Sequence, residues 1–508
     1  MASVIGQRWE VYPFGVVKSR VPKKGEIVCI SNTPEFGGGI IQLTGDGGRA
    51  IHELYEGWKS GEASPFLLQA QKGVPGGIAE LDSVGRVPAA QLPNSATGGD
   101  TKSVTLVIGT AHAGHALNTV DILCTGTNDH TQINNAIAAL PAGGGKIVIR
   151  EGTYNLGGPI NVDKDNVTIE GMGPSTILNA AASMTDLAAA PVTFTANNCK
   201  LANLKITNNY DNNIFVTSGV SIIGRNNTVS GCEIASGNYN VSYGYGVYIS
   251  GYGNTVSGCI ISNIASGNPT AAGTCYGVFI GGSSNTLVFC NTFSNQAHTC
   301  YGVYLNSGSN TLVFCNTFSN ISGYGVNCGV YLSSSGNNLV SGNTFSNSTG
   351  SGGYGSYGRS YGVYVYSSNN NLVSGNTFSN ISEANECYGV YINGSGNAAS
   401  GNVICNSSGS YGSYGIYIGG SNNDASRNTV ANQRSSGQTN QNTAAFYLPN
   451  TATHCRIHGN DISGVTAYGG AAWFNGATYY TAVPAGSPTG AAAWQSGSCG
   501  FNIVSRPA

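Results

Sequence analysis

The chain has 508 residues, a formal net charge of −2 and 9% charged residues, against roughly 25% in a typical globular protein. A near-neutral charge disfavours nucleic-acid binding through a basic surface, and no window holds the roughly 18 apolar residues that a membrane-spanning helix needs. The first residues, MASVIGQRWEVYPFG, lack the basic flank and apolar stretch of a secretory signal. We therefore expect the chain to fold in a cytosol.

The first hundred residues differ in composition from the rest. Residues 1–100 hold 19 of the 44 charged residues. Residues 1–66 are predicted to form a small β-rich unit, because strand-like runs at 26–30 and 39–43 are separated by Gly, Pro and Asn. Residues 67–100 contain several prolines and end in NSATGGD, which predicts a linker.

A short amphipathic helix is expected next. Its apolar residues recur at i, i+3, i+4 and i+7 as Ile133, Ala136, Ile137 and Leu140. Asp129 or Thr131 can cap its start, and Pro141 ends it. Such a helix must cover an apolar surface, and the open end of a stack of repeats offers one. Residues 101–200 are therefore predicted to hold a capping helix and the first rungs.

Residues 201–465 are repetitive. The word NTLVFCNTFSN occurs at 285–295 and again at 310–320, and YGVYI-like segments recur every 25 to 33 residues. Each such segment is followed by a turn and an NxxVSGNTFSN-like segment, and both segments favour β-structure. A unit of this length with two or three short strands and no helix predicts one rung of a parallel β-helix.

Alignment of the repeats gives rows of equivalent residues. One asparagine row is Asn291, Asn316, Asn343, Asn376, Asn402, Asn428 and Asn460. A second is Asn295, Asn320, Asn347, Asn380, Asn406 and Asn432. Asparagine tolerates left-handed backbone and can form hydrogen bonds along a stack. Phe293, Phe318, Phe345 and Phe378 form an apolar row that is predicted to be core, and residues 466–508, which leave the repeat, are predicted to be a cap.

Cysteines occupy the same rows. Cys275, Cys300 and Cys387 each precede the first tyrosine of a YGVY segment, and Cys290 aligns with Cys315. Stacked cysteines can form a disulfide at this spacing. The favoured alternative is that they are buried thiols acting as small apolar residues.

An outward row of aromatic residues is predicted from the YGVYI segments. Val and Ile share one face of a strand, so the second tyrosine must face the other way. This row is Tyr248, Phe279, Tyr304, Tyr331, Tyr364, Tyr391, Tyr417 and Tyr447. A monomer rarely exposes such a stripe, so we expect it to pack in a subunit interface, with sugar binding as an alternative.

Loops of varying length follow the second asparagine row and must project from one side of the stack. They include GYGSYGRS at 353–360 and SGSYGSY at 408–414. Tyrosine, serine and glycine in loops supply aromatic area and hydrogen-bonding groups. The candidate receptor-contact residues are therefore Tyr354, Tyr357, Arg359 and Tyr411.

Acidic residues are scarce in the repeats. Glycoside hydrolysis needs two carboxylates within roughly 5–9.5 Å of each other. Glu383 and Glu386, in the loop ISEANEC, are the best pair for one site, although solvated loop acids are the favoured interpretation. No metal-ligand pattern is present, and no cofactor is expected.

Several stretches resemble known families. KGVPGGIAELDSVGRVPAAQLP (72–93) resembles a linker motif of tail fibres and tail spikes of tailed phages, and PKKGEIV with IQLTGDGGRAIHEL resembles the small unit that attaches such fibres to the virion. GTNDHTQINNAIAALPAGGGKIVIREGTY (126–154) is similar to the start of the pectate-lyase-like β-helix, where a helix caps the first rung.

The resemblance implies an all-β, right-handed parallel β-helix in a receptor-binding protein of the virion tail. It also implies a parallel homotrimer that is attached through its N-terminal unit and binds a host-surface glycan. One alternative is a tail-spike depolymerase that cleaves this glycan. Another is an adhesin, or the fibre of a phage-like injection particle. Binding without cleavage is favoured because of the scarcity of acidic pairs.

Overall fold

A computed structural model of the chain describes residues 11–13, 27–31, 40–44, 104–180, 190–208, 216–236, 243–262, 273–295, 297–323, 325–346, 349–350, 358–383, 386–409, 412–431, 434–435, 442–449, 452, 454–463 and 472–475. The chain divides into two units, Met1–Lys102 and Ser103–Ala508. No helix in the described part is long and apolar enough to cross a membrane.

The first unit contains a three-stranded sheet. Strand β1 (Val11–Pro13) pairs in parallel with β2 (Ile27–Ser31), and β2 pairs antiparallel with β3 (Ile40–Thr44). Strands β2 and β3 each begin one residue later than the sequence pattern predicts. The candidate linker lies outside the described residues.

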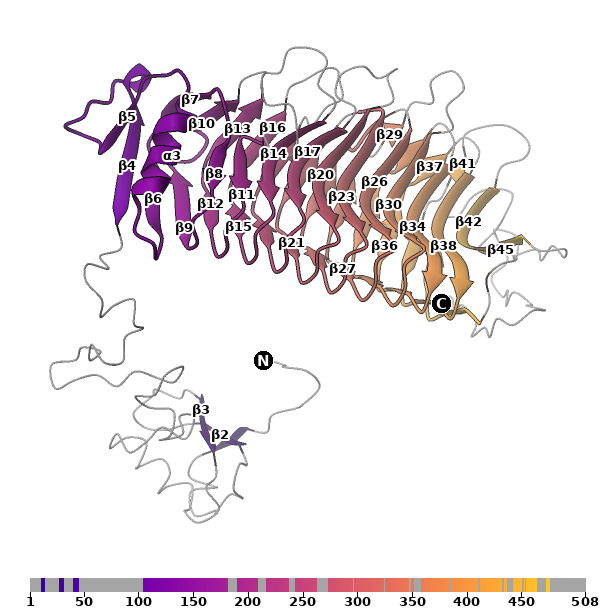
Figure 1. Ribbon diagram of the computed structural model, residues 1–508. Helices are drawn as coiled ribbons and strands as arrows, with labels where there is room; N and C mark the ends of the chain where they lie inside the picture. The colour runs from indigo at the N-terminus through magenta and orange to yellow at the C-terminus, as the bar shows by residue number, and fades with distance from the viewer. Residues whose placement is uncertain are drawn as a thin grey trace. The chain divides into compact units, whose positions relative to one another are not determined.

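The second unit is a stack of parallel strands arranged in three long sheets (Figure 1). We name each sheet after a residue that recurs in it.

The valine sheet contains β5 (Ile122–Cys124), β4 (Thr105–Thr110), β6 (Gly145–Ile149), β9 (Val167–Gly171), β12 (Lys200–Ala202), β15 (Thr228–Ser230), β18 (Thr255–Ser257), β21 (Leu287–Phe289), β24 (Leu312–Phe314), β27 (Leu339–Ser341), β31 (Leu372–Ser374), β35 (Ala398–Ser400), β39 (Asp424–Ser426) and β43 (Arg456–His458).

The phenylalanine sheet contains β7 (Gly152–Leu156), β10 (Thr176–Ala180), β13 (Lys205–Asn208), β16 (Glu233–Ser236), β19 (Ile260–Ser262), β22 (Thr292–Ser294), β25 (Thr317–Ser319), β28 (Thr344–Ser346), β32 (Thr377–Ser379), β36 (Val403–Cys405), β40 (Thr429–Ala431) and β44 (Asp461–Ser463).

The tyrosine sheet contains β8 (Ile160–Val162), β11 (Val192–Phe194), β14 (Val216–Ile222), β17 (Tyr243–Ile249), β20 (Thr274–Gly281), β23 (Thr299–Asn306), β26 (Val326–Ser333), β30 (Arg359–Tyr366), β34 (Glu386–Ser395), β38 (Gly412–Ser421), β42 (Asn442–Pro449) and β45 (Ala472–Asn475). Four shorter strands form a further parallel sheet beside it: β29 (Thr349–Gly350), β33 (Ser382–Glu383), β37 (Ser408–Gly409) and β41 (Arg434–Ser435).

Each rung visits the valine, phenylalanine and tyrosine sheets in turn, and each strand pairs in parallel with its counterpart on the next rung. This confirms the predicted parallel β-helix. Strand β45 lies within the segment predicted to be a cap, yet it pairs with β42 and so extends the tyrosine sheet.

The interior follows from the repeated words. In the three-residue strands the central side chain faces inward, as Val288 does in β21 and Phe293 in β22. The four predicted core phenylalanines stack along the interior with centroids 4.6 to 4.8 Å apart and planes within 7° of parallel. Each of these residues therefore packs against the same residue type on the next rung, which explains why the sequence segments repeat.

The first asparagine row bonds along the stack, as predicted. The Asn316 side chain accepts the Asn291 backbone N–H at 3.0 Å and donates to the Val288 carbonyl at 2.8 Å. Its neighbour Asn343 repeats this pattern with Asn316 and Val313. Each buried amide thus satisfies backbone groups at a corner where the sheet hydrogen bonds stop.

The second asparagine row has a different role. Asn320, Asn380 and Asn406 have φ near +55° and are exposed, so they supply the left-handed turns that asparagine tolerates. Asn295 departs from the row because it is fully buried without positive φ. Asn347 and Asn432 lie outside the described residues.

The glycines of the YGVY segments lie where the chain bends against the phenylalanine row. A Cβ atom at Gly302 would stand 2.4 Å from Phe318 Cδ1 and 2.6 Å from the Gly329 carbonyl oxygen. Only glycine fits at this contact without displacing backbone.

Helix α3 (His130–Ala139) contacts β5, β7 and β8 at the first rungs and buries Ile133, Ala136 and Ile137 (Figure 1). The predicted capping helix is therefore present. Of the two predicted N-cap residues, Asp129 holds the N-cap position, but its side chain does not bond to the helix. Asp129 precedes the helix, but its carboxylate accepts the N–H groups of Gly126 and Asn155 at 2.8 and 2.9 Å. Thr131 lies inside the helix rather than at its start.

Candidate functional site

The eight aromatic residues of the predicted outward row lie in register along the tyrosine sheet, from Tyr248 to Tyr447. All eight are half-buried. Their neighbours are mainly one another and a second aromatic row that sequence reasoning did not identify.

The second row consists of the first tyrosines of the YGVY segments: Tyr245, Tyr276, Tyr301, Tyr361, Tyr388 and Tyr414. Strict alternation would direct these residues inward with the valine two positions later. The intervening glycine is buried together with the valine that follows it, as Gly277 and Val278 are, which breaks the alternation. Both tyrosines of a segment therefore face outward. In the sequence, the glycine between tyrosine and valine could have indicated that the first tyrosine faces outward.

The rings of the two rows pack on each other and not on open solvent. Within a row they stack along the shaft, as Tyr391 does on Tyr417 (3.9 Å between centroids, 5°) and Tyr361 on Tyr388 (4.9 Å, 6°). Between rows they meet edge to face, as Tyr388 and Tyr391 do at 84°. Ring faces are thus occupied by neighbouring rings, a favourable arrangement for aromatic pairs.

The buried rings keep their phenol protons at neutral pH. Burial raises the pKa of Tyr245 and of Tyr364 to about 12, because the charged phenolate is disfavoured away from water. It also raises the pKa of Tyr388, which is only 6% exposed. The hydroxyl groups of these rows can therefore act as hydrogen-bond donors as well as acceptors.

The first-tyrosine row is interrupted within its length at β26, and it ends before β42, where Ala444 holds the tyrosine position. In β26 the first-tyrosine position is occupied by the fully buried Cys328. Tyr331 of the same strand turns to stack on Tyr301 (5.5 Å, 16°) and meets its own row neighbour Tyr304 at 63°. On the next rung Tyr361 stacks against Tyr364 (4.5 Å, 11°). The regular order of rings is therefore broken between β26 and β30.

A single ion pair lies directly beside this interruption. Arg359 begins β30 and Glu386 begins β34, and the register pairs the two residues across adjacent rungs. Arg359 Nε lies 2.9 Å from Glu386 Oε2, and the Tyr388 hydroxyl donates to the same carboxylate at 3.1 Å. Arg359 keeps a side-chain exposure of 48%. Within residues 243–431 only Arg359, Glu383, Glu386, Asp424 and Arg427 carry charge, so this pair stands out on a neutral surface.

The structure thus joins two predicted residues that were assigned to different sites. Arg359 was a contact candidate, and Glu386 was half of the weak acid pair. Glu386 does not behave as a solvated loop acid, since Arg359 and Tyr388 hold its carboxylate. Glu383 ends β33, and its side chain lies outside the description. Tyr354, Tyr357 and Tyr411 also lie outside the described residues.

Asp424 and Arg427 lie near one rung corner in the sequence, which predicts an ion pair between them. Asp424 instead accepts from His458 Nε2 at 3.1 Å and approaches Arg456 Nε at 3.5 Å, both from the next rung of the valine sheet. The reason is that Arg427 occupies the left-handed corner (φ 56°), whereas the strand register places Asp424 opposite Arg456.

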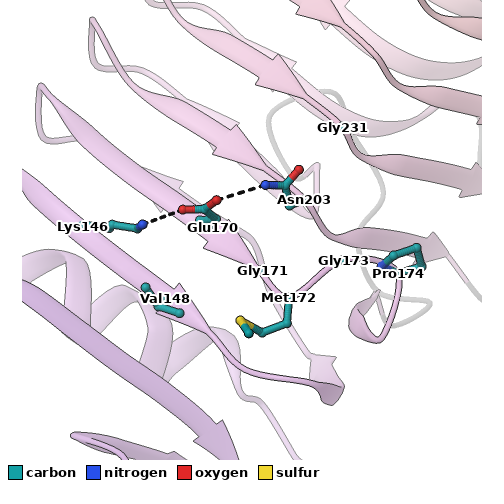
Figure 2. A pocket seen from close by; sticks show the side chains of 9 residues that line it. All are labelled: Lys146, Val148, Glu170, Gly171, Met172, Gly173, Pro174, Asn203 and Gly231. Carbon is teal, nitrogen blue, oxygen red and sulfur yellow. Dashed lines mark hydrogen bonds and ion pairs between the residues drawn. The ribbon is translucent and has the colours of Figure 1, made fainter.

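A pocket of about 570 Å³ lies on the outer face of the first rungs. Figure 2 shows Glu170 between Lys146 and Asn203, which bond to its two carboxylate oxygens at 2.6 and 3.0 Å. The Lys146 hydrogen bond lowers the pKa of Glu170. Gly171, Met172, Gly173 and Pro174 line the remainder. Glu170 is the only acid lining this pocket, which does not provide the two carboxylates of a glycosidase.

Comparisons with known proteins agree on the fold. A family model described as "Right handed beta helix region" matches residues 192–360, and a model described as "Periplasmic copper-binding protein (NosD)" matches residues 329–478. The fold is accordingly a right-handed parallel β-helix. No curated protein matches the sequence significantly.

Several solved structures have a similar fold. The Agl-KA catalytic domain is 15% identical (TM-score 0.48), and the match covers 72% of this chain and 66% of that one, slightly under two thirds of its length. A PL6 alginate lyase in complex with a trisaccharide is 12% identical (TM-score 0.45; 72% and 85% covered). The A-module of the Azotobacter vinelandii mannuronan C-5 epimerase AlgE4 is 15% identical (TM-score 0.39; 70% and 98% covered). At this level of identity the likeness concerns the fold alone.

Proposed function

We propose that the chain is a tail fibre or tail spike of a tailed virus, and that its β-helix binds a host-surface glycan where the aromatic rows are interrupted. The observation that carries this proposal is the Arg359–Glu386 pair with the Tyr388 hydroxyl, set beside tyrosine rows on one outer face. The phage-fibre-like stretch at 72–93 supports the viral role.

The chemistry of this face suits a neutral glycan. Sugar hydroxyls both donate and accept hydrogen bonds, and the face offers guanidinium donors, a carboxylate acceptor and phenol groups. Because neighbouring rings cover the ring faces, a sugar would be held by hydrogen bonds at the ring edges, and stacking would contribute little. This departs from the sugar-stacking alternative expected from the sequence.

Binding without cleavage fits the acid groups better than hydrolysis does. A glycosidase needs one acid to protonate the leaving group and a second to act as base or nucleophile. The Glu386 carboxylate is engaged by Arg359 and Tyr388. Among the side chains that the structure describes, no other carboxylate contacts this cluster.

The proposal includes the assembly. The fibre would be a parallel homotrimer that is joined to the virion tail through residues 1–66, and the half-exposed aromatic row would lie partly in the subunit interface. The mass of the full chain in solution, measured by sedimentation, tests this. A monomer would contradict both the trimer and the interface role of the row.

Binding and cleavage can be measured in one experiment. The full chain is applied to an array of purified bacterial surface polysaccharides, and bound protein and new reducing ends are scored for each. Arg359→Ala should weaken binding by about 10-fold or more, since a hydrogen bond to a charged group contributes about 1.5–3 kcal/mol. Arg456→Ala removes a similar cross-rung arginine from the valine sheet and should change binding less than about twofold.

Three results would argue against the proposal. Equal losses of polysaccharide binding in the two variants would show that the binding site does not lie at Arg359. Binding to none of the polysaccharides would contradict glycan recognition. Release of reducing ends that increases with time would favour the depolymerase alternative, and Glu383 and Glu386 would then be substituted first.

A further inference from the structure

A row of small buried side chains runs inside the tyrosine sheet, one residue before the first-tyrosine row. It comprises Cys275, Cys300, Asn327, Ser360, Cys387 and Ser413, all of them fully buried. Only Cys275 and Cys300 in this row are cysteines on adjacent rungs. Their sulfur atoms lie 2.8 Å apart.

The backbone around this pair suits a covalent link. Strands β20 and β23 are parallel and in register, with Cys275 opposite Cys300. Neighbouring strands lie about 4.8 Å apart, which is within the range of roughly 4.4–6.8 Å between the Cα atoms of a disulfide. Both side chains face into the same narrow interior, so the sulfur atoms meet without rearrangement of the fold.

We propose that Cys275 and Cys300 form a disulfide that joins consecutive rungs when the protein meets a small-molecule disulfide such as oxidised glutathione. The Cys300 thiolate attacks the small disulfide, forms a mixed disulfide and releases one small thiol. The Cys275 thiolate then attacks the Cys300 sulfur and expels the second small thiol. Two protein thiols are oxidised, two protons are released to solvent, and one small disulfide is reduced to two thiolates.

The burial of the pair determines when this happens. Both thiols are 0% exposed, so the folded reduced pair is protected from the oxidant. Burial also raises the pKa of Cys300, which keeps that thiol protonated. The oxidant reaches it during folding, or when β20 and β23 separate transiently. A chain made in a reducing cytosol would therefore carry thiols that become linked outside the cell.

The link would close a loop containing one complete rung, including β21 and β22. Opening of this rung would then require the strands to move together, which should slow unfolding. The aromatic rows lie on the other face of the sheet and keep their geometry. The cross-link does not depend on the proposed glycan binding, so either can fail alone.

The test counts free thiols in the full chain. The experiment uses the parent protein, Cys275→Ser and Cys387→Ser. Each protein is incubated with a mixture of reduced and oxidised glutathione and denatured in excess alkylating reagent, and its intact mass is then measured by mass spectrometry. If the pair is linked, the Cys300 sulfur that is released in Cys275→Ser should appear either as one more alkylated thiol than in the parent or as one glutathione adduct, and the intact mass distinguishes the two. Cys387→Ser, whose row neighbours are serines, should carry one fewer. The exposed Cys290 and Cys315 contribute equally to all three proteins.

One fewer alkylated thiol in Cys275→Ser, as in the control, would overturn the proposal. Cys300→Ala provides a second variant of the same pair, in case the serine prevents folding. Digestion without reduction and mass spectrometry should then yield a Cys275–Cys300 cross-linked peptide from the parent. Its absence from a parent that has lost thiols would assign the oxidation to other cysteines, such as Cys232 and Cys259.

Discussion

The asparagine row offers the sharpest test of how the stack is stabilised. Asn343 is 1% exposed. Its side-chain oxygen accepts the Asn316 backbone N–H at 2.9 Å, and its amide donates to the Val313 carbonyl at 2.9 Å. Asn343→Ala removes both partners and leaves these two backbone groups buried. The small alanine side chain cannot replace either bond.

The magnitude follows from these two groups. A buried polar group left without a partner costs about 1–3 kcal/mol, so two of them should lower the free energy of unfolding by about 4 kcal/mol. Denaturant unfolding of the full chain, followed by circular dichroism, measures this loss. Since each rung contacts only its neighbours, the loss should appear as a new early transition as well as a shifted midpoint.

Thr317→Ala is the matched control. Thr317 lies in β25, next to the same row, but its side chain is exposed on the outer face. Such a surface substitution should change the free energy of unfolding by less than about 0.5 kcal/mol. A loss below about 1 kcal/mol in Asn343→Ala would refute the reasoning. It would mean that water or backbone movement satisfies the groups that the amide bonds.

Three further results are expected. The free energy of unfolding should decline as the pH falls through the lowered pKa of Glu170, because protonation removes its bond to Lys146. In Glu170→Gln this dependence of stability on pH should be lost, and an unchanged dependence would contradict the assignment. Gly362→Ala should destabilise by about 1–3 kcal/mol, since its Cβ would lie 2.2 Å from Phe378 Cδ1; a neutral effect on thermal unfolding would show that the contact relaxes. Stability should also fall as the pH rises from the ordinary tyrosine pKa of about 10 towards the value of about 12 for Tyr364, because only the unfolded phenol ionises there. An absorbance titration in which all 28 tyrosines of the folded chain ionise near pH 10 would contradict this.

Much of the fold follows from the sequence because each rung repeats the environment of the one before it. The phenylalanine and first asparagine rows are predictable from alignment alone. The first-tyrosine row is not, since period-two alternation directs Tyr388 inward and fails where the consecutive residues Gly389 and Val390 are both buried. The Asp129 cap fails for a related reason, since a contact with the distant Asn155 determines where the carboxylate points.

Part of the candidate site could have been predicted from the sequence. Arg359 and Glu386 each precede the first tyrosine of their segment by two residues. Alignment on that tyrosine would have placed them opposite each other on adjacent rungs. If the repeats are instead aligned on their loops, whose lengths differ, Arg359 and Glu386 do not fall at equivalent positions. The Cys328 interruption was visible as a missing tyrosine, but its effect on Tyr331 depends on ring packing that no pattern encodes.

The position of this site follows from the limits of repetition itself. In an unbroken row every outward side chain is covered by identical neighbours, as Tyr391 is by Tyr417, so such a row offers the same ring edges at each rung and distinguishes no ligand. Specific recognition needs a place where the rung differs from its neighbours. In β26 a tyrosine is replaced by Cys328, the rings change order between β26 and β30, and the Arg359–Glu386 pair between β30 and β34 supplies charge on a neutral face. The regular rungs form the shaft, and the irregular rung is where one ligand can be distinguished from another.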